Sequence, residues 1–90
     1  MVRDELRKAS ETLSEAADRT DDETLREGLA KQADQLASLA DRDRGPDHGR
    51  LDRHQQSLRE LKAAADDETA DRIDTANEHI VAYRKTVEGV

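Results

Sequence analysis

The few large apolar side chains of this chain recur at intervals of three and four residues, and this spacing restricts the fold to helices. From Val2 to Ala16, for example, the intervals are 4, 3, 4 and 3. Such a series lies on one side of an α-helix, whereas a strand needs a period of two, which no stretch shows. The four series are Val2, Leu6, Ala9, Leu13 and Ala16; Leu25, Leu29, Gln32, Leu36 and Leu39; Leu51, His54, Leu58, Leu61 and Ala65; and Ile73, Ala76, Ile80, Tyr83 and Val87.

The first two boundaries between helices follow from the phase of the apolar series and from turn residues. Continuing the first series past Ala16 would bury Thr20 and Glu23. We therefore expect a turn there, where Thr20 and Glu23 have the spacing of a capping box. At the centre of the chain, Gly45 suits the position just after a helix, and Pro46 cannot continue one. These residues predict two helical hairpins joined near Pro46.

The third boundary has a weaker signal. Continuing the third series past Ala65 would bury charged residues, so a turn is expected at Asp66 and Asp67, either of which can cap the last helix. No glycine or proline stands there, which leaves open one continuous helix from about 50 to 87. The expected helices span about 3–19, 22–43, 47–65 and 67–87.

The architecture that best fits these segments is an all-α, antiparallel four-helix bundle built from two helical hairpins. Ninety residues fit a single helical domain, residues 1–90. The alternative is a set of helical hairpins with a long continuous C-terminal helix, which would need to dimerise to cover its apolar side. We call the inward-facing apolar series of each helix its seam. The seams are narrow and rich in alanine, so dimerisation through a leftover apolar stripe would also stabilise the bundle.

The charge of the chain excludes several classes of protein. Charged residues make up 41% of the sequence and the formal net charge is −7. Leu, Ile, Val and Phe total only 15 of 90 residues, a proportion that would favour disorder without the helical spacing. An acidic surface argues against a nucleic-acid partner, which requires clustered Lys and Arg. No apolar run approaches the ~18 residues of a membrane span, no signal peptide is evident and cysteine is absent, so we expect a cytoplasmic protein that does not bind membranes.

Four residues are candidates for a functional role: Asp47, His48, His54 and Tyr83. Asp47 and His48 lie in the central loop, where functional groups often sit, although Asp47 is also explained as the N-cap of the third helix. His54 takes a seam position, where a buried polar group fixes helix register or partner choice. Tyr83 is the only aromatic residue. Gly28, inside the second helix, either permits close helix approach, under Tyr83, or is simply tolerated.

No recognised catalytic or metal-binding pattern is present. His48 and His54 are six residues apart, whereas helix neighbours are separated by three or four; only Asp52 has suitable spacing from His48. There is no Glu-x-x-His motif, no Ser-His-Asp set and no glycine-rich phosphate loop. We therefore expect no enzyme activity, no catalytic residues, no bound metal and no cofactor.

The composition and the central segment indicate the environment of the protein. Asp outnumbers Glu by 13 to 9, Arg outnumbers Lys by 11 to 4, and Phe is absent. The central segment reads Asp41-Arg42-Asp43-Arg44-Gly45-Pro46-Asp47-His48-Gly49-Arg50-Leu51. In these features the chain resembles the small, uncharacterised, acidic all-helical proteins of halophilic archaea. The resemblance implies a cytoplasm with molar salt, in which the screening length falls to roughly 3 Å and repulsion among surface acids largely disappears.

Three classes of function remain. The first is a non-catalytic helical interaction or structural protein, whose partner is another protein or a second copy of the chain. The second is an acidic decoy that imitates nucleic acid; such a decoy should collect its acids on one face, whereas here arginines interrupt them. The third is a bundle that binds a small ligand or a metal ion. The sequence favours the first class.

Overall fold

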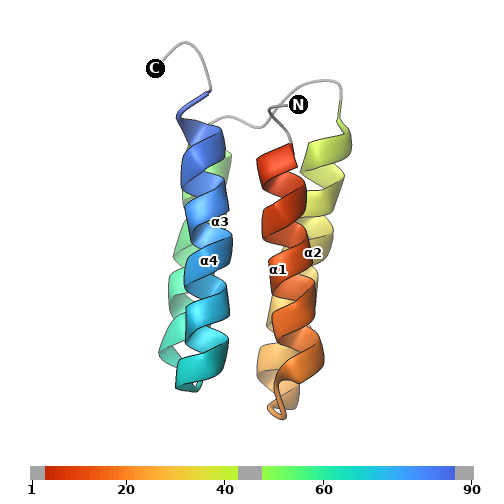
Figure 1. Ribbon diagram of the computed structural model, residues 1–90, viewed down its shortest axis with the longest axis vertical. Helices are drawn as coiled ribbons and strands as arrows, with labels where there is room; N and C mark the ends of the chain where they lie inside the picture. The colour runs from red at the N-terminus through yellow and green to blue at the C-terminus, as the bar shows by residue number, and fades with distance from the viewer. Residues whose placement is uncertain (1–3, 43–47, 87–90) are drawn as a thin grey trace.

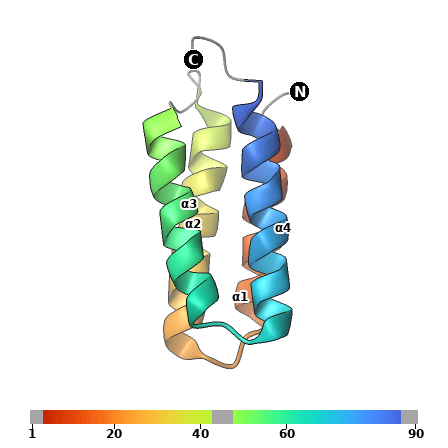
Figure 2. The same cartoon turned by 90° about the vertical axis from the view of Figure 1, so that its left-hand side faces the viewer.

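The described residues of the protein fold into four α-helices that run alternately up and down (Figure 1). The structure is a computed structural model and describes residues 4–42 and 48–86. α1 packs against α2 and α4, and α3 packs against the same two helices, so that α1 and α3 occupy opposite corners of the bundle (Figure 2). This arrangement confirms the predicted all-α four-helix bundle. The helices are α1 (Asp4–Arg19), α2 (Glu23–Asp41), α3 (His48–Ala63) and α4 (Asp67–Arg84).

Aspartate side chains begin the second helix of each hairpin. Asp22 precedes α2, and its Oδ1 accepts a hydrogen bond from the Leu25 backbone N–H at 3.0 Å. The predicted capping box is wrong, because the helix begins at Glu23; the Thr20 hydroxyl instead accepts from the Asp22 N–H at 3.2 Å. The cap therefore lies two residues later than the spacing indicated.

The weaker boundary is a true break. Asp66 precedes α4, and its Oδ1 accepts from the Thr69 N–H at 2.8 Å; this hydrogen bond lowers the pKa of the carboxyl. The alternative of one continuous helix from about 50 to 87 is therefore wrong.

Three of the four described helices end earlier than expected, while α1 ends at Arg19, as expected. α3 ends at Ala63, where 65 was expected, because the next two amides donate to carbonyls three residues back and tighten the chain into a turn. α2 ends at Asp41 and α4 at Arg84, where 43 and 87 were expected. The predicted roles of Gly45 and Pro46 lie outside the described residues.

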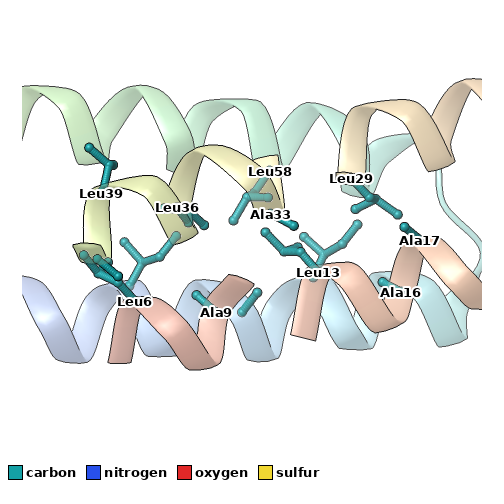
Figure 3. Packing of buried hydrophobic residues seen from close by; sticks show 14 of the residues in the cluster. Leu6, Ala9, Leu13, Ala16, Ala17, Leu29, Ala33, Leu36, Leu39 and Leu58 are labelled. Atoms are coloured by element: carbon teal, nitrogen blue, oxygen red, sulfur yellow. The ribbon is translucent and has the colours of Figure 1, made fainter. Parts of the chain in front are cut away.

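The core consists of leucine and isoleucine side chains from all four helices, interleaved with alanines. Figure 3 shows Leu6 and Leu13 of α1 directed toward the leucines of α2 and α3. Alanines such as Ala9 lie between them and let the helix backbones approach closely. Eight large side chains are less than 2% exposed: Leu6, Leu13, Leu29, Leu36, Leu51, Leu58, Ile73 and Ile80. All eight are positions that the helical spacing predicted to face inward.

Gly28 lies on α2 beside α3. A Cβ at this position would lie 2.6 Å from Cδ2 of Leu61, so the end of the Leu61 side chain would have to move. The neighbour of Gly28 is therefore Leu61 and not Tyr83. Among the described residues, no helix is both long enough and apolar enough to cross a membrane.

Candidate functional site

Helix α3 differs from the other helices in the polar residues on its inner side. Leu51 and Leu58 are 0% and 1% exposed, and between them His54 and Gln55 are 8% and 9% exposed. Because successive helix residues are rotated by about 100°, these two polar side chains point to different neighbours. His54 meets α2 and Gln55 meets α4. A side-chain hydrogen bond therefore ties α3 to each helix beside it.

The contact with α2 is a buried hydrogen bond between His54 and Gln32. His54 Nδ1 lies 2.6 Å from Gln32 Oε1. A carbonyl oxygen only accepts, so the imidazole carries its proton on Nδ1 and donates. Burial lowers the pKa of His54, and the nearby charge of Arg50 lowers it further. The ring is therefore neutral at pH 7, and both residues occupy the seam positions that the sequence predicted.

The contact with α4 is centred on Arg84. Its Nε donates to His48 Nδ1 at 3.0 Å, and its Nη1 donates to Gln55 Oε1 at 2.6 Å and to the Asp52 carboxylate. Gln55 Nε2 in turn donates to Asn77 Oδ1 at 2.7 Å. The Arg84 guanidinium therefore lies between His48 and Asp52. These two residues are the pair whose spacing of four along the helix was suitable for a shared metal ion. We call these five residues the Arg84 cluster.

The four candidates from the sequence do not form one site. His48 belongs to the Arg84 cluster, and its Nε2 is buried without a hydrogen-bond partner in the structure. His54 binds α2 on the other side of α3. Tyr83 is 4% exposed and belongs to the core. Asp47 lies outside the described residues. The structure brings His48 and His54 onto the same helix and directs them to different partners.

Sequence reasoning missed Arg84, Gln55 and Asn77. Each follows directly after a seam position, and the helical spacing placed only those preceding positions in the core. The polar character of two neighbours, Gln55 and Asn77, was the available signal. The spacing alone could not show that they meet, because the pairing depends on the height at which α3 and α4 lie beside each other.

The third histidine joins α4 to α1. His79 Nδ1 lies 2.8 Å from Glu5 Oε2, and this hydrogen bond lowers the pKa of the glutamate. Both side chains are partly exposed. The contact is a link at the edge of the seam, in keeping with the position of His79 next to Ile80.

The described residues form grooves on both sides of α3. The largest of these grooves, of about 370 Å³, lies between α3 and α4 and is lined by Gln55, Val81, Arg84 and Lys85. We call it the Val81 groove, because Val81, 36% exposed, is the one exposed large hydrophobic residue in the described part of the chain. A second groove between α3 and α4, of about 240 Å³, includes Arg59 in its lining. A third, also of about 240 Å³, lies between α2 and α3, and we call it the α2–α3 groove; its lining residues are Gln32, Gln35, Arg50, Arg53, His54 and Ser57.

None of these three grooves contains a grouping of acids and histidines suited to a metal. Within residues 4–42 and 48–86, no set of three or more His, Asp or Glu side chains is placed to hold a metal ion. Several polar side chains of α3, among them His54 and Gln55, bind side chains of the neighbouring helices. The arrangement is therefore suited to holding helices in register and to binding a ligand or partner along the grooves.

Comparison with known proteins identifies one family. The sequence pattern of a family of unknown function, DUF7553, matches residues 1–86. No curated protein and no solved structure matches the chain.

Proposed function

This chain belongs to DUF7553, a family of unknown function, and we propose that it is a non-catalytic helical interaction module that works in a cytoplasm of high salt. The observation that carries this proposal is the position of Val81. The one exposed large hydrophobic residue of the described surface lies in the largest of the three grooves, beside Arg84 and Lys85. An apolar centre with a polar, arginine-containing rim is typical of protein interfaces.

The partner is another protein or a second copy of this chain. Its contact surface carries an apolar side chain for Val81 and acidic groups for Lys85 and the rim of the groove. A broad apolar stripe is not available for the contact, since the other large hydrophobic residues in the described ranges are at least partly buried. The contact is therefore small and partly polar, as in transient interfaces.

The distribution of charge favours this function over an acidic decoy. Acids and bases on the described surface pair with one another: Arg7 Nη2 lies 2.7 Å from Asp41 Oδ1, and Lys62 Nζ lies 2.8 Å from Asp74 Oδ1. Arg72 Nη1 lies 2.9 Å from Glu68 Oε1. A phosphate mimic needs acids without interleaved cations. The pairing instead fits a surface adapted to salt.

The interaction is tested by cross-linking the protein to its partner in native extract kept at molar KCl. Val81→Glu places a charge in the groove and should abolish the cross-linked product. Thr75→Glu, the matched control, adds the same charge at another exposed, β-branched position of α4 and should leave the product unchanged. Light scattering on the purified protein shows whether the partner is a second copy. Equal yields from both variants, or no product from the unmodified protein, would reject the proposal.

The salt adaptation is tested separately by circular dichroism. The narrow core must offset the repulsion of a net charge of −7, so helicity should rise as KCl is raised from millimolar to molar concentration. Sodium perchlorate at equal ionic strength distinguishes screening, which both salts supply, from specific salt effects. A full helical signal in salt-free buffer would contradict the adaptation.

A further inference from the structure

The α2–α3 groove has a lining opposite in charge to the rest of the protein. The chain contains 22 acidic residues and has a net charge of −7. None of the described residues that line this groove is acidic, and two of them, Arg50 and Arg53, are cationic. The groove therefore concentrates positive charge on an otherwise acidic molecule.

The lining is also rich in hydrogen-bond donors that the described residues leave unused. Gln35, Arg53 and Ser57 form no hydrogen bond or ion pair with other residues in the described ranges. The Gln32 carbonyl accepts from His54, which leaves its NH₂ group to donate elsewhere. Guanidinium, amide and hydroxyl groups thus face one concave surface, and no acidic residue is among its described lining.

We propose that the α2–α3 groove binds a small oxyanion, a phosphate or carboxylate group. Arginine suits both, because its planar fork of N–H groups matches two oxygens of either anion. The size of the groove, about 240 Å³, lies below the roughly 300–1,000 Å³ of pockets for drug-sized ligands. It therefore fits a free anion or a short carboxylic acid rather than a nucleotide.

His54 reports on occupancy of the groove. Its ring is neutral and donates through Nδ1 to Gln32, and the charge of Arg50 opposes its protonation. An anion beside Arg50 and Arg53 offsets that charge, so binding should raise the pKa of His54. By linkage, protonation of His54 should strengthen anion binding by the same factor.

The test is a nuclear magnetic resonance titration of protein labelled in histidine and arginine. Inorganic phosphate and succinate are added in separate series at constant ionic strength, in the KCl concentration that gives the full helical signal. Signals of the His54 ring and the Arg53 guanidinium should shift and saturate, while His79, on the far side between α1 and α4, should not. Saturation by one series assigns the groove to phosphates or to carboxylates. Shifts that stay linear in both series would overturn the proposal.

Two variants of α3 make the test specific. Arg53→Gln removes a cation from the groove and should weaken binding about tenfold or more, the effect of losing a charged hydrogen bond. Arg59→Gln removes the same charge from the same helix on its α4 side, where Arg59 lines a different groove. This control should change affinity less than twofold. Equal losses in the two variants would show a nonspecific charge effect and overturn the site, whatever the fate of the Val81 contact.

Discussion

Helices α1 and α3 occupy opposite corners of the bundle and differ in the side chains that they bury. The buried residues of α1 are all apolar, and this helix packs extensively against both neighbours. Those of α3 are two leucines and two polar residues, His54 and Gln55, and this helix packs less against the same neighbours. Both helices form side-chain hydrogen bonds to their neighbours, but the buried surface of α1 is entirely apolar, whereas half of the buried residues of α3 are polar.

The difference between the two helices separates two roles: the apolar contacts of α1 stabilise the bundle, and the buried hydrogen bonds of α3 select the register of the helices. Alanine and leucine seams are non-directional, so they stabilise the bundle without selecting one register strongly. A buried hydrogen bond is satisfied in one arrangement, because an unpaired group costs more than the paired group gains. His54 with Gln32, and Gln55 with Asn77, thus determine how α3 sits. The grooves beside α3 follow from the same less extensive packing.

The largest expected loss of stability comes from a charge placed in the core on the α3 side of the bundle. Leu58→Asp places a carboxylate at a position that is 1% exposed. An unpaired buried charge costs several kcal/mol, comparable with the ~5–15 kcal/mol stability of small proteins. The cooperative melting transition by circular dichroism should disappear. Gln56→Asp, on the exposed side of α3, changes the net charge equally and should leave the transition in place. An unchanged melting curve for Leu58→Asp would contradict the placement of Leu58 in the core.

The next largest losses of stability are expected from truncating a leucine in α1 and a leucine in α3, which allows the two helices to be compared. Leu13→Ala in α1 removes a fully buried side chain and should cost about 2–5 kcal/mol of unfolding free energy. Leu61→Ala in α3 removes a partly buried one and should cost less than half as much. Urea denaturation at fixed KCl measures both. Equal costs would mean that α3 is packed as tightly as α1.

The hydrogen bond between α2 and α3 gives the next effect. Gln32→Leu leaves the His54 N–H buried without a partner and should cost about 1–3 kcal/mol. Combining it with His54→Leu removes both polar groups and should restore most of that loss. Urea denaturation of the two single variants and the double variant gives the coupling energy. Additive losses would show that the two side chains do not act as a pair.

The smallest effect is a dependence on pH. The pKa of His54 is lower in the folded state than its ordinary value of 6.5, so the unfolded chain binds the proton first. Stability from this group is present above pH 6.5 and falls toward pH 5 by at most about 1.4 kcal/mol per pH unit. Glu5 and Asp66, whose pKa values are lowered, lose their contributions only below about pH 4.5. The double variant, which lacks His54, should lose stability less steeply between pH 6.5 and 5; identical slopes would contradict the assignment.

Much of the fold could be predicted because its signals are local. The spacing of Leu6 and Leu13 identified the inner side of α1, and the dipeptide at Asp66 marked the start of α4. The N-cap of α2 was predicted at the wrong residue. Thr20 and Asp22 are both suitable N-cap residues, and only the path of the turn determines which of them caps the helix. For the candidate site, His54 was identified, but Arg84 was not. Its position beside the seam does not show whether the arginine binds residues of α3 or is solvated.

The sequence by itself determined the helices, their inner sides and the acidic character of the surface, because helical spacing, caps and charge depend on residues within a few turns. Only the tertiary structure decided which side chains meet: His54 with Gln32, and Arg84 with His48 and Asp52. It also placed Gly28 beside Leu61. These contacts depend on which helices are neighbours and at what height they pass. The acid-free groove between α2 and α3 has the same origin, since residues from two distant segments line it.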